Sequence, residues 1–444
     1  MLSAPPVPPI PAHSLLVFLL QVGLLLALAL LFGRAAARLG LPAVVGELCV
    51  GVVLGPTLLG HVPGGLAGWL LPRQAEQFHL LDAAGTLGVL LLVGITGMEL
   101  DLALVRRRGR AALGISLAGL VLPLGLGLAA GRYVPESFLG PAVTGRSVFA
   151  LFLGVAMCVS AIPVIVKTLS DMNLLHRNVG QLTLAAGTID DVVGWVLLSV
   201  VSAMATTGVH PSTVATSLMW LVVIAVVATT AGRWLLGGVL RLTERATGPG
   251  APAVVVVATV VLCSAATQAM GLEAVFGAFV AGMVLSRSGG GLVLARLAPV
   301  RAFVMSVLAP LFFATAGLRV DLTALRHPVV LGFALLVLFL AVLGKFTGAF
   351  VGARFSRLTK WEALAIGAGM NSRGVIEIVV ASVGLRLGVL TTDSYTVVVL
   401  VAVVTSLMAP PILRFATRHI EQTAEETLRA RVAARARGEQ LDPA

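Results

Sequence analysis

The sequence predicts an all-α polytopic membrane protein with about thirteen transmembrane helices. Its 444 residues are 58% hydrophobic and 11% charged, with a mean hydropathy of +1.02, which is far more apolar than a soluble domain. The apolar residues form runs of about 20, the length that crosses a bilayer. The basic residues, which give a formal charge of +11, lie mainly in short loops between these runs. In these loops they indicate the orientation of the chain in the membrane, and we expect no nucleic acid partner.

The predicted spans follow one another with short connections. The first, at 13–32, has no basic region before it and two arginines after it, so we interpret it as a retained helix and not a signal peptide. The second to fourth cover 42–60, 81–99 and 111–131, and the fourth follows a loop with four arginines. The fifth and sixth, at 147–168 and 178–205, hold polar residues within apolar runs. The remaining spans are 213–240, 251–269, 272–286, 299–317, 328–353, 361–385 and 393–413.

The distribution of basic residues predicts the topology. An odd number of spans places the two ends of the chain on opposite sides of the membrane. With the C-terminus cytoplasmic, 23 of the 31 Lys and Arg residues face the cytoplasm, six face outside and two lie within spans. We therefore expect an extracytoplasmic segment at 1–12, a transmembrane domain at 13–415 and a charged cytoplasmic tail at 416–444, in a protein of the cell membrane.

Two pairs of segments indicate an internal repeat. The stretch VVGELCVGVVL at 44–54 aligns with VFGAFVAGMVL at 275–285, and GMELDL at 97–102 aligns with GLRVDL at 317–322. Both matches imply a shift of seven spans. An odd shift inverts one copy in the membrane, as in the inverted repeats of secondary transporters, here at about 42–205 and 272–413. The alternative is chance similarity between glycine-rich apolar helices.

The repeat pairs the fifth span with the twelfth, and both contain residues that interrupt helices. Pro163 removes a backbone donor in the fifth span, and Ser160 can satisfy freed backbone groups. The twelfth span carries Asn371, Ser372, Arg373 and Gly374 in mid-run. We expect two crossed broken helices near the middle of the membrane. The alternative is a simple proline kink and a packed glycine.

Charged side chains within the spans mark the candidate site. Asp190 and Asp191 stand together in an apolar run, where each central charge costs about 2.5–3.5 kcal/mol. Neighbouring helix residues point about 100° apart, so the two cannot share one partner. Lys345 is the best partner for one aspartate, and the other is expected to line a cavity. Arg373 can pair with Glu377 at i, i+4, and purely structural ion pairing is the alternative for both pairs.

These segments resemble the monovalent cation:proton antiporter-2 superfamily, close to the plant-type cation/proton exchangers and their bacterial relatives. The stretches SAIPVIVKTLSDMNLLHRNVGQLTLAAGTIDDVVGW and GMNSRGVIEIVVA belong to an ordered, highly specific set of motifs over about 14–415, and the second is closest to the plant-type exchangers and their bacterial relatives. The resemblance implies the sodium/proton antiporter fold, with a core domain that moves against a dimerisation domain, and hence a homodimer in the lipid bilayer.

The same resemblance implies roles for individual residues. Asp191 matches the carboxylate that binds the cation or protons in turn, and Asp190 matches the one that pairs with Lys345. Ser160 and Arg373 fall in the two crossovers. The supporting residues in this region are Pro163, Thr188, Asn371, Arg373 and Glu377. Two features depart from the family pattern. Asp190 stands where the plant-type relatives usually carry Asn, which resembles the electrogenic branch. Glu377 lies four residues after Arg373, whereas many bacterial members have an acid two residues after it.

We therefore expect an antiporter that exchanges Na⁺ or K⁺ for protons by alternating access, electrogenically and without a cofactor. A proton- or sodium-coupled carrier of an organic solute and a cation channel on the same scaffold are the alternatives. An enzyme is not expected, because the seven histidines are scattered and no nucleophile–base or metal-ligand spacing occurs. The three cysteines lie in apolar runs and are interpreted as core residues. The sequence does not select the cation, and it assigns no role to Glu47.

Overall fold

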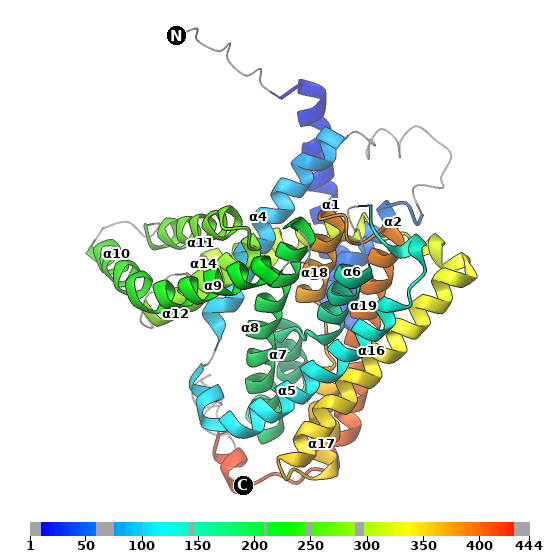
Figure 1. Cartoon of the computed structure of the whole chain (residues 1–444). Coiled ribbons are helices and arrows are strands. Elements are labelled where there is room, and N and C mark those ends of the chain that lie inside the picture. Colours follow the sequence, from blue (N-terminus) through cyan, green and yellow to red (C-terminus); the bar gives the residue numbers. More distant parts are fainter. Residues whose placement is uncertain are drawn as a thin grey trace. The chain divides into compact units, whose positions relative to one another are not determined.

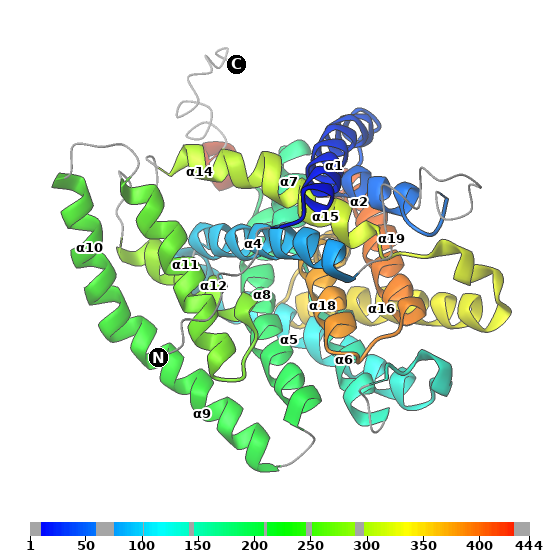
Figure 2. The ribbon, with the colours of Figure 1, turned by 90° about the horizontal axis from the view of Figure 1, so that it is seen from above.

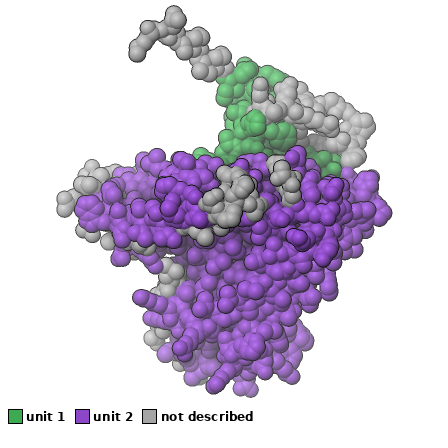
Figure 3. All heavy atoms as spheres, in the orientation of Figure 1, with its two compact units in different colours: residues 1–89, 302–321 green, residues 90–301, 322–444 purple. Residues whose placement is uncertain are grey.

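The computed structural model describes residues 10–58, 75–100, 102–141, 146–207, 211–245, 251–288 and 297–429, and these ranges are almost wholly helical (Figure 1). Most of the expected extracytoplasmic segment (1–9) and of the cytoplasmic tail (430–444) lies outside the described residues. The chain forms two compact units, coloured in Figure 3. Unit 1 comprises Met1–Val89 and Ala302–Asp321, and unit 2 comprises Leu90–Arg301 and Leu322–Ala444.

The predicted fold class is confirmed. Within the described residues, ten helices are long and apolar enough to cross a membrane, a bent helix pair forms an eleventh candidate, and two apolar helices are shorter. Together they match the thirteen predicted spans in order. The long ones include α1 (Ala12–Arg38), α4 (Ala75–Glu99), α5 (Leu102–Arg132), α8 (Asn178–Thr207), α11 (Ala251–Ala269), α16 (Pro328–Phe355) and α19 (Thr392–Thr417).

One predicted span is longer than the helix observed. The second span was expected at 42–60, but α2 runs only over Ala43–Leu54. Gly55 leaves the helix in an extended conformation (ψ −161°), and Pro56 follows it. A residue before proline is disfavoured in the α conformation, so the helix ends before the apolar run does.

In unit 1, α2 packs against both α1 and α15 (Ala309–Gly317), which also contact each other; Figure 2 shows the three helices together from above. A Cβ atom on Gly51 would lie 2.0 Å from the carbonyl oxygen of Ala314, and one on Gly46 would lie 2.3 Å from that of Phe32. No side chain fits at these positions. Both contacts are therefore close backbone approaches that require glycine, as is common between membrane helices.

Unit 2 repeats this arrangement with the aligned segment α12 (Ala274–Ser288). A Cβ on Gly282, the partner of Gly51 in the alignment, would lie 2.0 Å from the carbonyl oxygen of Gly94 in α4. One on Gly277, the partner of Gly46, would lie 2.4 Å from that of Cys263 in α11. The aligned glycines thus make equivalent contacts with equivalent neighbours. This favours a structural repeat over chance similarity.

A helix bundle that includes α5, α8, α16 and α19 surrounds the candidate site in unit 2. Small residues bring α16 and α5 together. A Cβ on Gly344 would lie 2.9 Å from Pro123 Cα, and one on Gly348 would lie 2.3 Å from the carbonyl oxygen of Ala118. Glycines four residues apart let two backbones meet closely. This contact brings Lys345, the neighbour of Gly344, into the interior of the bundle, where it is fully buried.

Candidate functional site

Two helix breaks meet at the centre of unit 2. The first separates α6 (Arg146–Cys158) from α7 (Ile162–Asp171), with Pro163 in the first turn of α7. The second separates α17 (Lys360–Met370) from α18 (Val375–Arg386), and the chain bends by 41° there. The backbone N–H of Ala161 donates to the carbonyl of Ser372 at 3.3 Å. The two predicted broken helices are therefore present, and their breaks touch.

Buried cations satisfy the backbone at the first break. The last four carbonyl groups of a helix have no partner within that helix, and inside a membrane such groups need partners from the protein. Arg373 donates to two of these carbonyls in α6, Lys345 donates to a third at 2.5 Å, and the fourth accepts from the backbone N–H of Val159. These acceptors are Ala156 and Met157, Cys158, and Val155, respectively.

Both carboxylate oxygens of Asp190 accept hydrogen bonds from buried donors. Its side chain has no solvent exposure. Oδ1 accepts from the Ser116 hydroxyl at 2.5 Å, and Oδ2 accepts from the ammonium of Lys345, with which it forms an ion pair. The Ser160 hydroxyl lies 3.0 Å from Oδ2 and 2.9 Å from the carbonyl of Met370, so its single proton serves one acceptor at a time. Asp190 thus links α5, α8, α16 and both breaks.

Asp191, in contrast to Asp190, has no hydrogen-bond donor among the described residues. Its side chain is also fully buried, yet neither carboxylate oxygen has a hydrogen-bond partner among the described residues. The backbone N–H of Ile162, at the N-terminus of α7, interacts with this carboxylate without reaching hydrogen-bond geometry. The positive end of a helix dipole favours an anion there. The expected cavity at this aspartate is not open in this structure, because no part of the side chain reaches solvent.

Arg373 and Glu377 form the second ion pair at the breaks. Arg373 donates to Glu377 Oε1, and the carbonyl of Arg373 accepts from the Ser406 hydroxyl. Glu377 Oε2 has no hydrogen-bond partner in the described part of the chain. Asn371 and Ser372 are buried in the same break, and Asn371 Oδ1 and Ser372 Oγ also lack described partners. Unsatisfied oxygens of this kind surround cation sites in membrane transporters.

A count of buried charges singles out one residue. In the described ranges, the buried Asp, Glu, Lys and Arg residues other than Asp191 each form an ion pair: Asp190 with Lys345, Arg373 with Glu377, Arg177 with Glu426 and Glu273 with Arg386. Asp191 has none. A bare carboxylate in a dry interior is very unfavourable, so this side chain requires a proton or a cation.

Two residues differ in importance from the sequence-based expectation. Thr188 donates its hydroxyl to the carbonyl of Leu184 in its own helix at 2.9 Å, so its single proton is not directed at the aspartates. Ser116 was not predicted, although it donates to Asp190 from another helix. A single serine in an apolar helix carries no pattern that separates it from other buried serines. Only the packing of α5 against α8 identifies it.

Comparison with known proteins matches the chain to a described family. Residues 24–419 match the model for the sodium/hydrogen exchanger transmembrane family. The Na⁺/H⁺ antiporter NhaS4 of Synechocystis is 31% identical, over 90% of this chain and 97% of that protein. The Na⁺/H⁺-K⁺ antiporter GerN of Bacillus cereus is 28% identical, over 90% of this chain and 96% of that protein. The Cation/H⁺ antiporter 15 of Arabidopsis thaliana is 29% identical, and the chain spans 49% of its length.

The fold has a solved counterpart. The sodium proton antiporter MjNhaP1 of Methanocaldococcus jannaschii superimposes with a TM-score of 0.65, over 91% of this chain and 97% of that chain, at 16% identity. The helical architecture, the family match over most of the chain and the similarity to full-length bacterial relatives agree with one another. This chain belongs to the sodium/hydrogen exchanger family of transmembrane proteins.

Proposed function

We propose that this protein exchanges a monovalent cation, Na⁺ or K⁺, for protons across the cell membrane by alternating access. The observation that carries the proposal is the unpaired carboxylate of Asp191, buried beside two touching helix breaks. The names of the bacterial relatives, Na⁺/H⁺ and Na⁺/H⁺-K⁺ antiporters, support the same activity.

The exchange follows from charge balance at Asp191. Its carboxylate is neutralised either by a proton or by a partly dehydrated cation, and one carboxylate cannot carry both. A cation that binds therefore displaces the proton, and a proton that binds displaces the cation. The structure holds Asp191 sealed from solvent, as alternating access requires of a state between the two open ones. Ser160, Asn371 and Ser372 offer hydroxyl, amide and carbonyl oxygens from the two breaks, the ligand type that suits Na⁺ and K⁺.

The remaining buried charges maintain the breaks. Lys345 and Arg373 satisfy the carbonyls at the end of α6 and are themselves neutralised by Asp190 and Glu377. We assign these four residues, with Pro163 at the start of α7, to positioning the site.

Exchange is proposed to be electrogenic, which requires a second proton site besides Asp191. Neighbouring acids titrate as a coupled set, and we propose that the adjacent Asp190 carries this second proton in addition to its positioning role. If two protons move per cation, one net charge crosses in each cycle, which is worth about 2.3 kcal/mol at 100 mV.

The proposed topology follows the basic residues. Residues 1–12 lie outside, 13–415 form the transmembrane domain and 416–444 lie in the cytoplasm, because this orientation places 23 of 31 basic side chains inside. We further propose a homodimer, on the strength of the family resemblance.

Proteoliposomes that enclose a pH-sensitive dye test the function. Addition of Na⁺ or K⁺ outside acidified vesicles is expected to raise the internal pH with the wild-type protein and not with Asp191→Asn. Glu47→Gln is the matched control, since it also converts a membrane carboxylate to an amide but belongs to unit 1, whereas the residues of the site belong to unit 2. Near-normal exchange by Asp191→Asn contradicts the assignment. Cation flux without a pH change favours a channel, and flux that needs an added organic solute favours a solute carrier.

A further inference from the structure

Helix α8 carries four buried side chains whose polar atoms have no hydrogen-bond partner among the described residues. They are Asp191, Trp195, Ser199 and Ser202, and each is at most 3% exposed. Buried polar groups normally have a partner in the protein or in ordered water. Because leaving such a group unsatisfied is unfavourable, four of them on one helix indicate a role besides packing.

The four residues lie on one face of α8. Successive helix residues are about 100° apart, so the other three fall within an arc of about 80° measured from Asp191. They extend for about 16 Å along the axis, toward the C-terminal end of the helix, because each residue rises about 1.5 Å. Thr206, the next polar residue on this face, is exposed. Trp195, Ser199 and Ser202 therefore form a polar row from the buried carboxylate to the exposed end of the helix.

Other helical hydroxyl groups of this protein are satisfied within their own helix. A serine or threonine in a helix can donate to the carbonyl four residues earlier. Thr183 and Thr188 of α8 do so at 2.8 and 2.9 Å, and Ser264 of α11 does so at 2.8 Å. The serines of the polar row do not. Since Thr188 lies on the same face before Asp191, the hydroxyl groups are unsatisfied only on the C-terminal side of the carboxylate.

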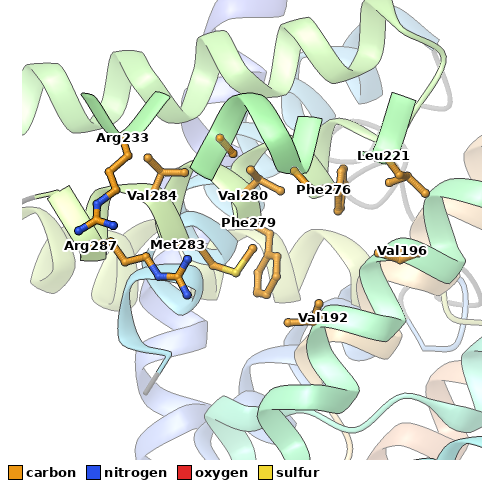
Figure 4. Close-up of a pocket in the computed structure, with 12 residues that line it drawn as sticks. Val192, Val196, Leu221, Arg233, Phe276, Phe279, Val280, Met283, Val284 and Arg287 are labelled. Carbon is orange, nitrogen blue, oxygen red and sulfur yellow. The ribbon is translucent and has the colours of Figure 1, made fainter. Parts of the chain in front are cut away.

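The packing beside the polar row is loose. Val192 and Val196 occupy the adjacent face of α8 and line a cavity of about 180 Å³ between α8, α12 and α9 (Pro211–Val227), with Phe279 on the α12 side (Figure 4). The ring of Phe279 also packs against that of Trp195, with 6.1 Å between their centroids. Protein interiors are normally close-packed, so a cavity of this size lets α8 and α12 move apart here with the loss of few contacts.

We propose that the polar row lines the path by which Asp191 exchanges ions with the extracytoplasmic side. When α8 and α12 separate, water and the hydrated cation supply partners for Trp195, Ser199 and Ser202, and polar groups of this kind replace part of the hydration shell of an ion. The proposed topology places the N-terminal end of α8 in the cytoplasm, so the polar row leads outside. The inference rests on the proposed exchange function, to which it adds the direction of access and the residues that provide it.

Thiol labelling from each side of the membrane tests this path. Ser199→Cys and Ser202→Cys are treated with a membrane-impermeant cationic methanethiosulphonate in right-side-out and in inverted vesicles. A thiol reacts as its thiolate, which forms in water, so we expect both positions to react from outside at least about tenfold faster than Val200→Cys. Val200 is the matched control, because it lies at the depth of Ser199 on the opposite side of α8 from Asp191. Mass spectrometry of the digested protein locates each adduct, so the three native cysteines do not interfere.

Alanine variants separate a role in the path from a role in stability. Removing an unsatisfied buried hydroxyl is not expected to destabilise the protein. Ser199→Ala/Ser202→Ala should therefore unfold at no lower a dodecyl sulphate concentration than the wild type, and yet exchange an externally supplied cation several-fold more slowly. Ser264→Ala is the matched control, because Ser264 is 2% exposed and its hydroxyl is satisfied within α11. It should keep the wild-type rate of exchange.

The outcomes distinguish this path from the proposed function. If the wild-type protein exchanges cations for protons, equal labelling at positions 199, 200 and 202 would overturn the path. Labelling from the cytoplasmic side alone, or a wild-type exchange rate in Ser199→Ala/Ser202→Ala, would overturn it as well. Faster labelling of the two serine positions from outside, in a protein whose wild type does not exchange these ions, would support the path and refute the proposed function.

Discussion

The buried ion pair between Lys345 and Asp190 gives the strongest stability prediction. Both side chains have no solvent exposure, and Lys345 also donates to the carbonyl of Cys158. Replacing Lys345 by Met keeps much of the side-chain volume but leaves the Asp190 charge with two hydroxyl donors and no cation. Removing one partner of a buried pair costs about 3–5 kcal/mol. We expect Lys345→Met to lower the free energy of unfolding by an amount in this range.

The double variant Lys345→Met/Asp190→Asn tests the cause. It removes both charges, and Asn keeps an oxygen that accepts from Ser116. Replacing a buried ion pair by neutral groups is often close to neutral, so the double variant should lie within about 2 kcal/mol of the wild type. Lys360→Met is the control, because Lys360 is exposed and its only described ring contact is 5.5 Å from the centre of Trp361; it should change stability by less than about 1 kcal/mol.

Unfolding in mixed micelles with increasing dodecyl sulphate provides the assay. Tryptophan fluorescence, to which Trp195 in the core beside the site contributes (1% exposed), reports unfolding. If the free energy of unfolding of Lys345→Met lies within about 1 kcal/mol of the wild-type value, the ion pair contributes little to stability and the reasoning is wrong. The reasoning also fails if the double variant is as unstable as the single one.

Two further predictions concern packing and the N-terminal end of α8. A Cβ at Gly282 would lie 2.0 Å from the carbonyl of Gly94, so Gly282→Ala should destabilise the protein by about 1–3 kcal/mol, whereas Gly237→Ala, which meets nothing within 4 Å, should be neutral or stabilising in the same unfolding assay. Burial raises the pKa of Glu426, but hydrogen bonds from the Asn178 and Thr423 backbones and the charge of Arg177 outweigh it and hold this pKa below 4.5. A carboxylate whose pKa is lowered by its contacts stabilises those contacts, here between residues 423–429 and the start of α8. The stabilisation is present at pH values above the pKa of the free carboxylate and is lost as pH falls through the pKa of the bound one. The protection factors for amide exchange of residues 423–429, which correct for the intrinsic dependence of exchange on pH, should therefore be high at pH 7 and low at pH 3. Glu426→Gln should lower them at pH 7, and equal protection factors would contradict this.

The sequence was sufficient for the spans and for much of the site. Lengths of apolar runs predicted thirteen helical segments, and the polar residues around Pro163 and Arg373 predicted both breaks, because lipid leaves so few ways to satisfy a polar backbone. The pairing of Lys345 with an aspartate was predicted because few other cationic side chains lie within the spans. The prediction extended the second span too far, because the run of apolar residues continues past Gly55 and Pro56.

Other features depend on contacts between helices and have no local signal. The donation by Ser116 requires α5 to pack against α8, and no residue pattern in α5 alone predicts that contact. The role of Arg373 as a cap for α6 also follows from the crossing of the two breaks and not from its own span. The full burial of Asp191 is a property of the closed conformation alone. Under the proposed alternating access the same sequence also adopts open conformations, so sequence patterns do not predict this burial.

Proton release on cation binding tests the central claim most directly. The purified protein is held in weakly buffered detergent with a pH indicator, and Na⁺ or K⁺ is added near neutral pH. The account predicts a saturable release of protons from the wild type and from Glu47→Gln, and none from Asp191→Asn. Saturable proton release that persists unchanged in Asp191→Asn would show that another group exchanges the two ions.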